Sequence, residues 1–137
     1  MKTLNDYTDT LTSKLFADNG AFFAFGNKQF EEKKQEGVTY VSLMGGLLCP
    51  KEKSKVLMQD FEKIFDDAVR QQVKDFGAEK IISHEYFNHE TQITGDNQQV
   101  IDVLSTHREL FPELFTDEII LKTCKQCFKK AVANDWF

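Results

Sequence analysis

Residues 84–90 (HEYFNHE) form the densest cluster of residue types that could do chemistry in this sequence. Histidine titrates near neutral pH, and a neighbouring carboxylate can orient a histidine or raise its pKa. Asn88, His89 and Glu90 are therefore candidate residues of a binding or acid–base site, and His84 is a fourth candidate. The alternative is a polar strand edge or turn, in which these side chains lie in solvent.

The spacing of His84 and His89 argues against a shared metal ion. On a helix, residues five apart diverge by roughly 140°. On a strand they point to opposite faces. The zinc-protease motif instead needs two histidines four residues apart on one helix face. We therefore expect no bound metal, and nothing in the sequence calls for a cofactor.

The three cysteines are Cys49, Cys124 and Cys127. The single CxxC falls inside an expected helix, whereas the redox motif needs a helix N-terminus that lowers a thiol pKa. Zinc would need a second ligand pair, and no second CxxC exists. Cys49 and His107 are no more than conceivable donors. Two buried core thiols are therefore expected at Cys124 and Cys127. The odd count and the absence of an N-terminal signal pattern predict reduced thiols and a cytoplasmic location.

Two glycine-containing segments have both a chemical and a structural interpretation. Residues 45–51 (GGLLCPK) could bind an anion between a strand and a helix, although the P-loop spacing is absent. Glycines at such a place more often only let the chain turn. Residues 94–96 (TGD) are typical of a turn followed by a helix cap, so Asp96 is expected to cap rather than catalyse.

The elements that position these residues can be predicted from the periodicity of apolar residues. Helices are expected over residues 3–18, 28–36 (capped by Asn27), 51–76, 97–106 and 117–134 (capped by Thr116), and strands over 21–25, 38–44 and 79–90. The segment 79–90 fits a helix about as well, and Gly77 before it and a turn after it favour the strand. Residues 107–115 are expected to form a loop around Pro112.

This element order predicts an α+β fold, with about five helices on a small sheet of two or three strands. A chain of 137 residues suits a single domain over residues 1–137. The chain has 13 Phe residues, most of which we expect to be buried. The helix over 51–76 should bury Phe61, Phe65 and Val69, and the last helix should turn Ile120, Cys124, Cys127, Phe128 and Ala131 to one side.

Charge and hydropathy limit the classes of partner. The net charge is −5, and the basic residues alternate with acids, as in residues 28–36 (KQFEEKKQE). Duplex nucleic acid and an anionic membrane surface are therefore not expected partners. No apolar run approaches the ~20 residues that span a bilayer.

The segment 20–50 (GAFFAFGNKQFEEKKQEGVTYVSLMGGLLCP) resembles a family of small uncharacterised proteins of bacteriophages, prophages and gut-type bacteria. The similarity continues through 88–90 (NHE) and 94–96 (TGD) to 135–137 (DWF), and it covers most of the chain. The resemblance implies an origin in a virus or mobile element and a role inside a bacterial cell. It implies no catalytic activity.

Three hypotheses about function follow. The first is a phage-associated accessory protein that binds a host or phage macromolecule, most naturally a protein. The second is a small enzyme with a polar site around Asn88, His89 and Glu90, which convergence of these side chains in a pocket would favour. The third is a structural component of a virion, which would present a large apolar patch and form a stable oligomer. The sequence leaves the oligomeric state open.

Overall fold

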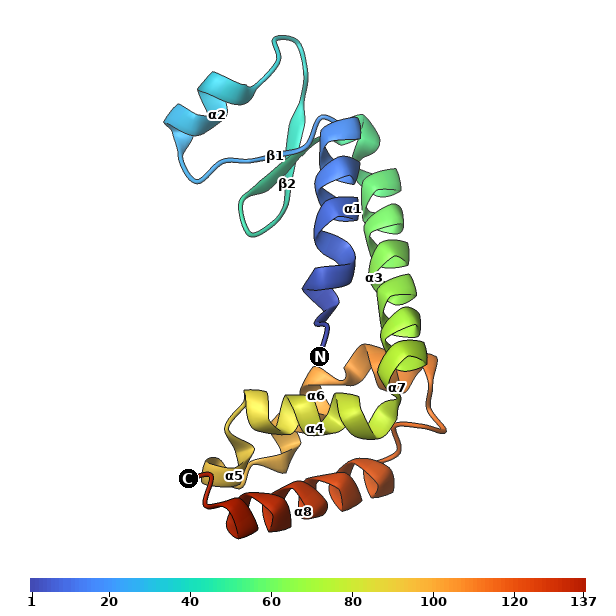
Figure 1. Ribbon diagram of the computed structural model, residues 1–137. Helices are drawn as coiled ribbons and strands as arrows, with labels where there is room; N and C mark the ends of the chain where they lie inside the picture. Colours follow the sequence, from blue (N-terminus) through green and yellow to red (C-terminus); the bar gives the residue numbers. More distant parts are fainter. The chain divides into compact units, whose positions relative to one another are not determined.

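The computed structural model describes residues 1–137 and contains eight α-helices, one 3-10 helix and one three-stranded sheet (Figure 1). The chain forms two compact units. Unit 1 consists of Met1–Leu4 and Asp66–Phe137, and unit 2 consists of Asn5–Phe65. The α+β class is confirmed, whereas the number of about five helices is wrong. The single domain over residues 1–137 stays a prediction.

Unit 2 holds the sheet and the helices around it. Its elements in chain order are α1 (Leu4–Asp18), β1 (Phe22–Phe23), α2 (Asn27–Lys33), β2 (Tyr40–Met44), β3 (Leu47–Pro50), the 3-10 helix η1 (Lys51–Lys53) and the first part of α3 (Ser54–Phe76). The strand order is β1-β3-β2, and both pairs are antiparallel. The Gly45-Gly46 turn joins β2 to β3 with φ angles of 48° and 83°, which favour glycine.

Strand β3 was not predicted from the sequence. Residues 45–51 therefore do not form the anion-binding loop considered above, because they make a hairpin turn and a paired strand. The two glycines let the chain turn, which is the structural interpretation given above for this segment. The expected N-cap at Asn27 is also wrong by one residue, since α2 begins at Asn27 and Gly26 precedes it.

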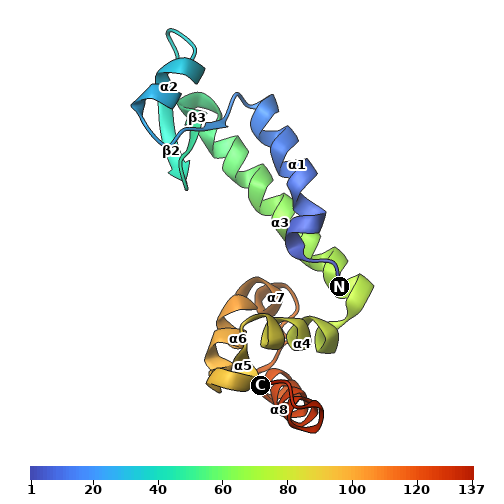
Figure 2. The ribbon, with the colours of Figure 1, turned by 60° about the vertical axis from the view of Figure 1, so that its left-hand side comes forward.

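The core of unit 2 is small. Leu47, Cys49 and Leu57 are fully buried, and half-buried residues of α1 and β2 pack against them. Figures 1 and 2 show α1 alongside α3, and in this contact the Phe16 and Phe61 rings stack with centroids 6.1 Å apart. The position of α1 beside α3 thus closes one side of this core.

The expectation that most phenylalanines are buried is wrong. Phe115 is the only Phe among the fully buried residues, and Phe25 is 76% exposed. The core of unit 2 is too small to enclose its rings, which instead pack against one another, as Phe23 does against Phe16 and Phe25. Val69 is buried as predicted, whereas Phe61 and Phe65 are half-buried.

Helix α2 is hydrogen-bonded to the chain at and just after β1. The Phe25 backbone N–H donates to Gln29 Oε1 over 2.8 Å. Lys33 Nζ donates to the Phe23 carbonyl oxygen, also over 2.8 Å. These two side chains, four residues apart on α2, attach the helix to the chain at the end of β1.

Unit 1 is helical. It comprises the end of α3 followed by α4 (Ala78–Asn88), α5 (Thr91–Thr94), α6 (Asn97–Val103), α7 (Ser105–Leu110) and α8 (Asp117–Asn134). Helix α8 packs against α4, α5 and α6, and Figure 2 shows it viewed close to its axis. Two predictions fail here: residues 79–90 form a helix rather than a strand, and α7 occupies part of the expected loop 107–115.

The core of unit 1 explains why residues 79–90 form a helix. Ile81, Ile82 and Tyr86 are all at most 2% exposed. They pack on one face of α4 against α6, α8 and Phe115. Residues four apart share a helix face, so α4 can bury Ile82 and Tyr86 together. The buried side of α8 consists of Ile120, Thr123, Cys124, Cys127 and Ala131.

Candidate functional site

The candidate residues His84 and Asn88 lie on the same face of α4, because they are four residues apart on a helix. Both line a hollow of about 510 Å³ between α4 and the C-terminal end of α8, which we call the α4–α8 hollow. Its lining consists of Met1, Lys80, Ser83, His84, Phe87, Asn88, Lys130 and Trp136. The structure thus brings two of the four candidate residues together.

The other two candidates point elsewhere. His89 ends α4, and its Nε2 lies 3.2 Å from Glu85 Oε2, one turn earlier on the helix. Its Nδ1 lies 3.3 Å from Gln99 Nε2 of α6. Glu90 follows in a left-handed conformation with φ 52°, and its side chain is exposed. His89 therefore links α4 to α6, and Glu90 lies in the turn to α5.

The α4–α8 hollow combines positive charge with aromatic surface. Lys80, His84 and Lys130 line it, and no carboxylate does. The Lys130 ammonium lies 5.6 Å from the centroid of the Trp136 ring, and that of Lys80 lies 5.9 Å from the Phe76 ring. Neither lysine forms an ion pair within the chain. Aromatic faces, rather than acids, therefore hold both ammonium groups at this site.

Trp136 is fixed at the edge of the hollow by three interactions. Its ring meets the Phe87 ring edge-on, with centroids 5.5 Å apart. Its backbone N–H donates to the Ala131 carbonyl oxygen over 3.0 Å, and its own carbonyl oxygen accepts from Gln92 over 3.3 Å. These contacts place the only tryptophan of the chain in the lining of this hollow.

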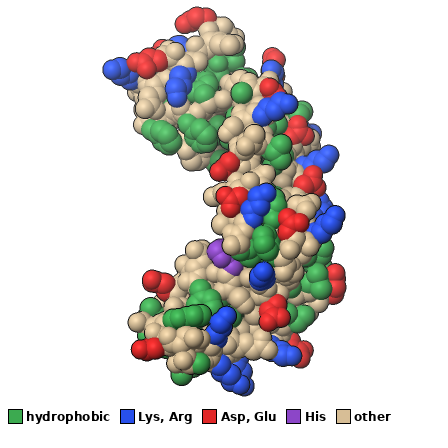
Figure 3. All heavy atoms as spheres, in the orientation of Figure 1, with side chains coloured by type: hydrophobic (Ala, Val, Ile, Leu, Met, Phe, Trp, Pro, Cys, Tyr) green, Lys and Arg blue, Asp and Glu red, His purple; other side chains and the backbone are tan.

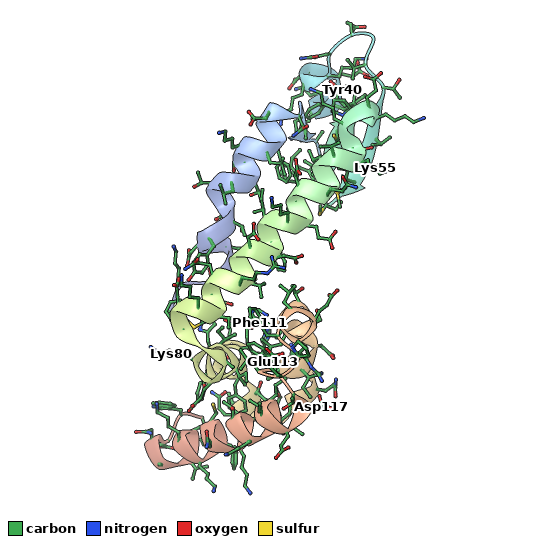
Figure 4. All side chains as sticks on the ribbon, turned by 90° about the vertical axis from the view of Figure 1, so that its right-hand side faces the viewer. Tyr40, Lys55, Lys80, Phe111, Glu113 and Asp117 are labelled. Carbon is green, nitrogen blue, oxygen red and sulfur yellow. The ribbon has the colours of Figure 1, made fainter.

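Two other hollows contain acidic residues. A hollow of about 740 Å³ at the start of α8 contains Arg108, whose Nη2 lies 2.5 Å from Asp117 Oδ1. In unit 2, a hollow of about 480 Å³ has Glu52 between Lys51 and Lys53 in its lining. Figure 4 shows Asp117 well apart from Lys80, so the hollow at the start of α8 is separate from the α4–α8 hollow.

Helix α8 also has an exposed apolar face, which we call the α8 outer face. Leu121, Phe128 and Val132 are 44%, 47% and 56% exposed, and they fall within an arc of about 40° on a helical wheel. The Phe137 ring packs on Phe128 with centroids 6.3 Å apart. The prediction that Phe128 is buried with Cys124 is therefore wrong, because Phe128 lies at the margin of the buried arc.

Lysines border the α8 outer face. Lys122, Lys125 and Lys129 are exposed and occupy the arc next to the apolar row. None of the three forms an ion pair within the chain, and no acid occurs between Ile119 and Asn134. Figure 3 shows hydrophobic and lysine side chains next to each other at the surface over α8. This basic apolar face contrasts with the net charge of −5 for the whole chain.

The three cysteines are free and buried, as expected for Cys124 and Cys127. Burial raises the pKa of Cys124 to about 11, and the nearby Cys127 raises it further. Burial likewise raises the pKa values of Cys49 and Cys127. Thiols with raised pKa values are poor nucleophiles at neutral pH, so these cysteines are core residues rather than reactive groups.

A buried polar chain that starts at His107 was not predicted from the sequence. This side chain is 4% exposed, and its Nε2 lies 2.8 Å from Gln72 Oε1. Gln72 Nε2 in turn donates to the Lys2 carbonyl oxygen over 3.3 Å. Burial lowers the pKa of His107 to about 4, so the ring is neutral at pH 7. A single histidine among polar neighbours gives no sequence signal for such a role.

No three His, Cys, Asp or Glu side chains lie close enough together to hold a metal ion. The absence of a metal and of a cofactor stays a prediction. None of the helices combines the length and the apolar composition that a bilayer-spanning segment requires.

Comparison with known proteins places the chain in a family. A family model described as "Family of unknown function (DUF7659)" matches residues 4–130. The chain belongs to the DUF7659 family. The match covers α1 through most of α8, and it includes the α8 outer face up to Lys130. The DUF7659 chain matches no curated protein and no solved structure.

Proposed function

We propose that this DUF7659 protein is an accessory protein of phage or prophage origin that acts in the bacterial cytoplasm by binding a protein partner. The resemblance of residues 20–50 to phage-encoded proteins supports the origin. The three free thiols agree with a reducing compartment. The α8 outer face supports the binding role, and it is the observation that carries the proposal.

The residues of the α8 outer face suit a helix of a second protein. Leu121, Phe128 and Val132 form one row along α8, and such a row can pack against the apolar side of a partner helix. Lys122 and Lys125 beside this row would attract acidic side chains that flank the partner's apolar residues. The partner is therefore an acidic amphipathic helix.

A second copy of this chain fits the face less well. In an antiparallel pair of α8 helices with Leu121 opposite Phe128, Lys125 of one chain would meet Lys125 of the other near the two-fold axis. Like charges placed opposite each other are unfavourable. The lysine row thus favours a different, acidic chain over self-association.

The enzyme hypothesis finds less support in the site. Acid–base catalysis needs groups that converge on one reacting atom. Of the four candidate residues, His84 and Asn88 line the α4–α8 hollow, whereas His89 contacts Glu85 and Gln99. Glu90 lies exposed in the following turn.

The proposal is tested by affinity capture with matched variants from lysate of the bacterium that carries the gene. The comparison uses wild type, Phe128→Glu on the α8 outer face, and Val56→Glu as a control at an exposed apolar position of α3. We expect a protein that wild type and Val56→Glu retain and that Phe128→Glu loses. The purified partner should bind at least tenfold more weakly to a Lys122→Glu/Lys125→Glu variant.

Melting curves establish first that each variant is folded. Equal retention by Phe128→Glu would contradict the proposal, because it would place the contact elsewhere. A captured partner without an acidic helix would also contradict it. Reversible dimerisation that Phe128→Glu abolishes would replace the acidic partner with a second copy of this chain.

A further inference from the structure

The α4–α8 hollow shares no residue with the α8 outer face, and it carries an inference of its own. We propose that this hollow binds a phosphate monoester attached to a planar ring. The hollow has two lysines and a histidine at its surface and aromatic rings beside them. The partner proposed for the α8 outer face does not account for this combination.

The positive charge points to a dianion. Lys80 and Lys130 are both held over aromatic rings, at 5.9 Å and 5.6 Å from the ring centroids, and neither has a carboxylate partner. Two ammonium groups without counter-ions match the charge of −1.5 to −2 that a phosphate monoester carries at neutral pH. His84 and the Asn88 amide, on the same face of α4 as Lys80, add hydrogen-bond donors for phosphate oxygens.

The aromatic surface points to a ring on the ligand. Phe87 and Trp136 line the hollow, and their edge-to-face contact leaves Trp136 44% exposed. Aromatic side chains bind nucleobases by stacking against the flat face of the ring. The volume of about 510 Å³ lies within the usual range for small-molecule sites, about 300–1,000 Å³. Inorganic phosphate alone would leave the rings uncovered.

Two sources supply this chemistry, a nucleoside monophosphate and a phosphotyrosine side chain. Both ligands present a dianionic phosphate beside a planar ring, so the same residues of the α4–α8 hollow would recognise either of them. The α4–α8 hollow has no carboxylate in its lining. It differs in this respect from the hollow at the start of α8 and from the hollow of unit 2, in which Asp117 and Glu52 lie next to the basic groups.

The fluorescence of Trp136 measures binding directly, because the chain has no other tryptophan. The full chain is titrated with AMP, with phosphotyrosine amide and with phenyl phosphate. Adenosine, tyrosine amide and inorganic phosphate serve as the arms that lack the phosphate or the ring. We expect a saturable change with at least one ring-bearing phosphate and binding at least tenfold weaker in every arm that lacks either part. The tighter of the AMP and phosphotyrosine arms identifies the source.

Variants locate the site. Lys80→Gln should weaken binding about tenfold, and Lys125→Gln on the α8 outer face should leave binding unchanged. Lys130→Gln changes the surroundings of Trp136 itself, so its affinity is measured by calorimetry. Absence of saturable binding by all three ring-bearing phosphates would overturn the proposal. Equal binding of inorganic phosphate, or an equal loss in Lys125→Gln, would overturn it as well. Neither result bears on the capture experiment, so the two proposals fail independently.

Discussion

At the scale of single residues, His107 makes stability depend on pH. Its folded-state pKa is about 4, against 6.5 for an unperturbed histidine, because burial disfavours the charged ring. Between these two values the unfolded chain binds more protons than the folded chain. Stability is therefore fully present above pH 6.5, falls as the pH drops towards 4, and loses about 3 kcal/mol through this residue.

Urea denaturation at several pH values measures this effect. His107→Gln keeps a side-chain N–H that can donate to Gln72, but it cannot titrate. We expect the difference in unfolding free energy between wild type and this variant to change by about 3 kcal/mol between pH 7 and pH 4. A difference that stays constant over this range would show that His107 is protonated to the same extent in the folded and the unfolded chain.

The cysteines give a second prediction at this scale. All three thiols are buried, and burial raises their pKa values, that of Cys124 to about 11. Disulfide exchange needs the thiolate, so the folded protein should react slowly with a thiol reagent such as DTNB at pH 8. The same reagent should find three thiols once the protein is denatured. Fast reaction of the Cys124–Cys127 pair in folded protein would contradict their buried position.

Residue types and spacing predicted only part of the candidate site. The sequence indicated His84 and Asn88 as candidate binding residues, and in the structure both line the α4–α8 hollow. Lys130 and Trp136 were not predicted there, because residues more than forty positions away come together only through the packing of α8 on α4. His107 was missed for the same reason, since its partner Gln72 lies on α3.

At the scale of elements, the helices with long apolar periodicity were predictable. The bounds of α1, α3 and α8 agree with the predicted segments to within three residues. Residues 79–90 were wrongly assigned because Ile81, Ile82, Tyr86 and Phe87 fit a strand and a helix equally well. Burial against α6 and α8 stabilises the helix, and this burial cannot be predicted from the local sequence. The short elements β3, α5 and α7 have four, four and six residues, too few for a pattern of apolar residues to repeat several times.

A buried and an exposed phenylalanine should differ in how much they contribute to the free energy of unfolding. Phe115 is fully buried in unit 1, so Phe115→Ala should lower the free energy of unfolding by about 3–5 kcal/mol. Phe25 is 76% exposed, so Phe25→Ala should change it by no more than about 0.5 kcal/mol. Thermal or urea unfolding of the two variants beside wild type measures the contrast. Similar losses in both would mean that Phe25 is covered in the folded protein.

At the scale of the whole molecule, the charge distribution separates the α8 outer face from the rest of the chain. The chain carries −5 overall, whereas Lys122, Lys125 and Lys129 lie on one side of α8 without acidic partners. A partner held by these lysines should bind more weakly as salt rises, because the Debye length falls from about 8 Å at 0.15 M to about 3 Å at 1 M. Calorimetry with the captured partner at these two concentrations measures this dependence, and equal affinities would contradict a charge-guided contact.

Site-specific photo-cross-linking shows directly whether the α8 outer face binds an acidic helix of another protein. One variant carries Phe128→p-benzoylphenylalanine, and the control carries the same group in place of Phe25, which is also exposed. After irradiation in the bacterial cell, the cross-linked peptides are mapped by mass spectrometry. We expect position 128 to react with an acidic amphipathic segment of a second protein and position 25 not to do so. Cross-links from position 128 to another copy of this chain, or to the same proteins as position 25, would contradict it.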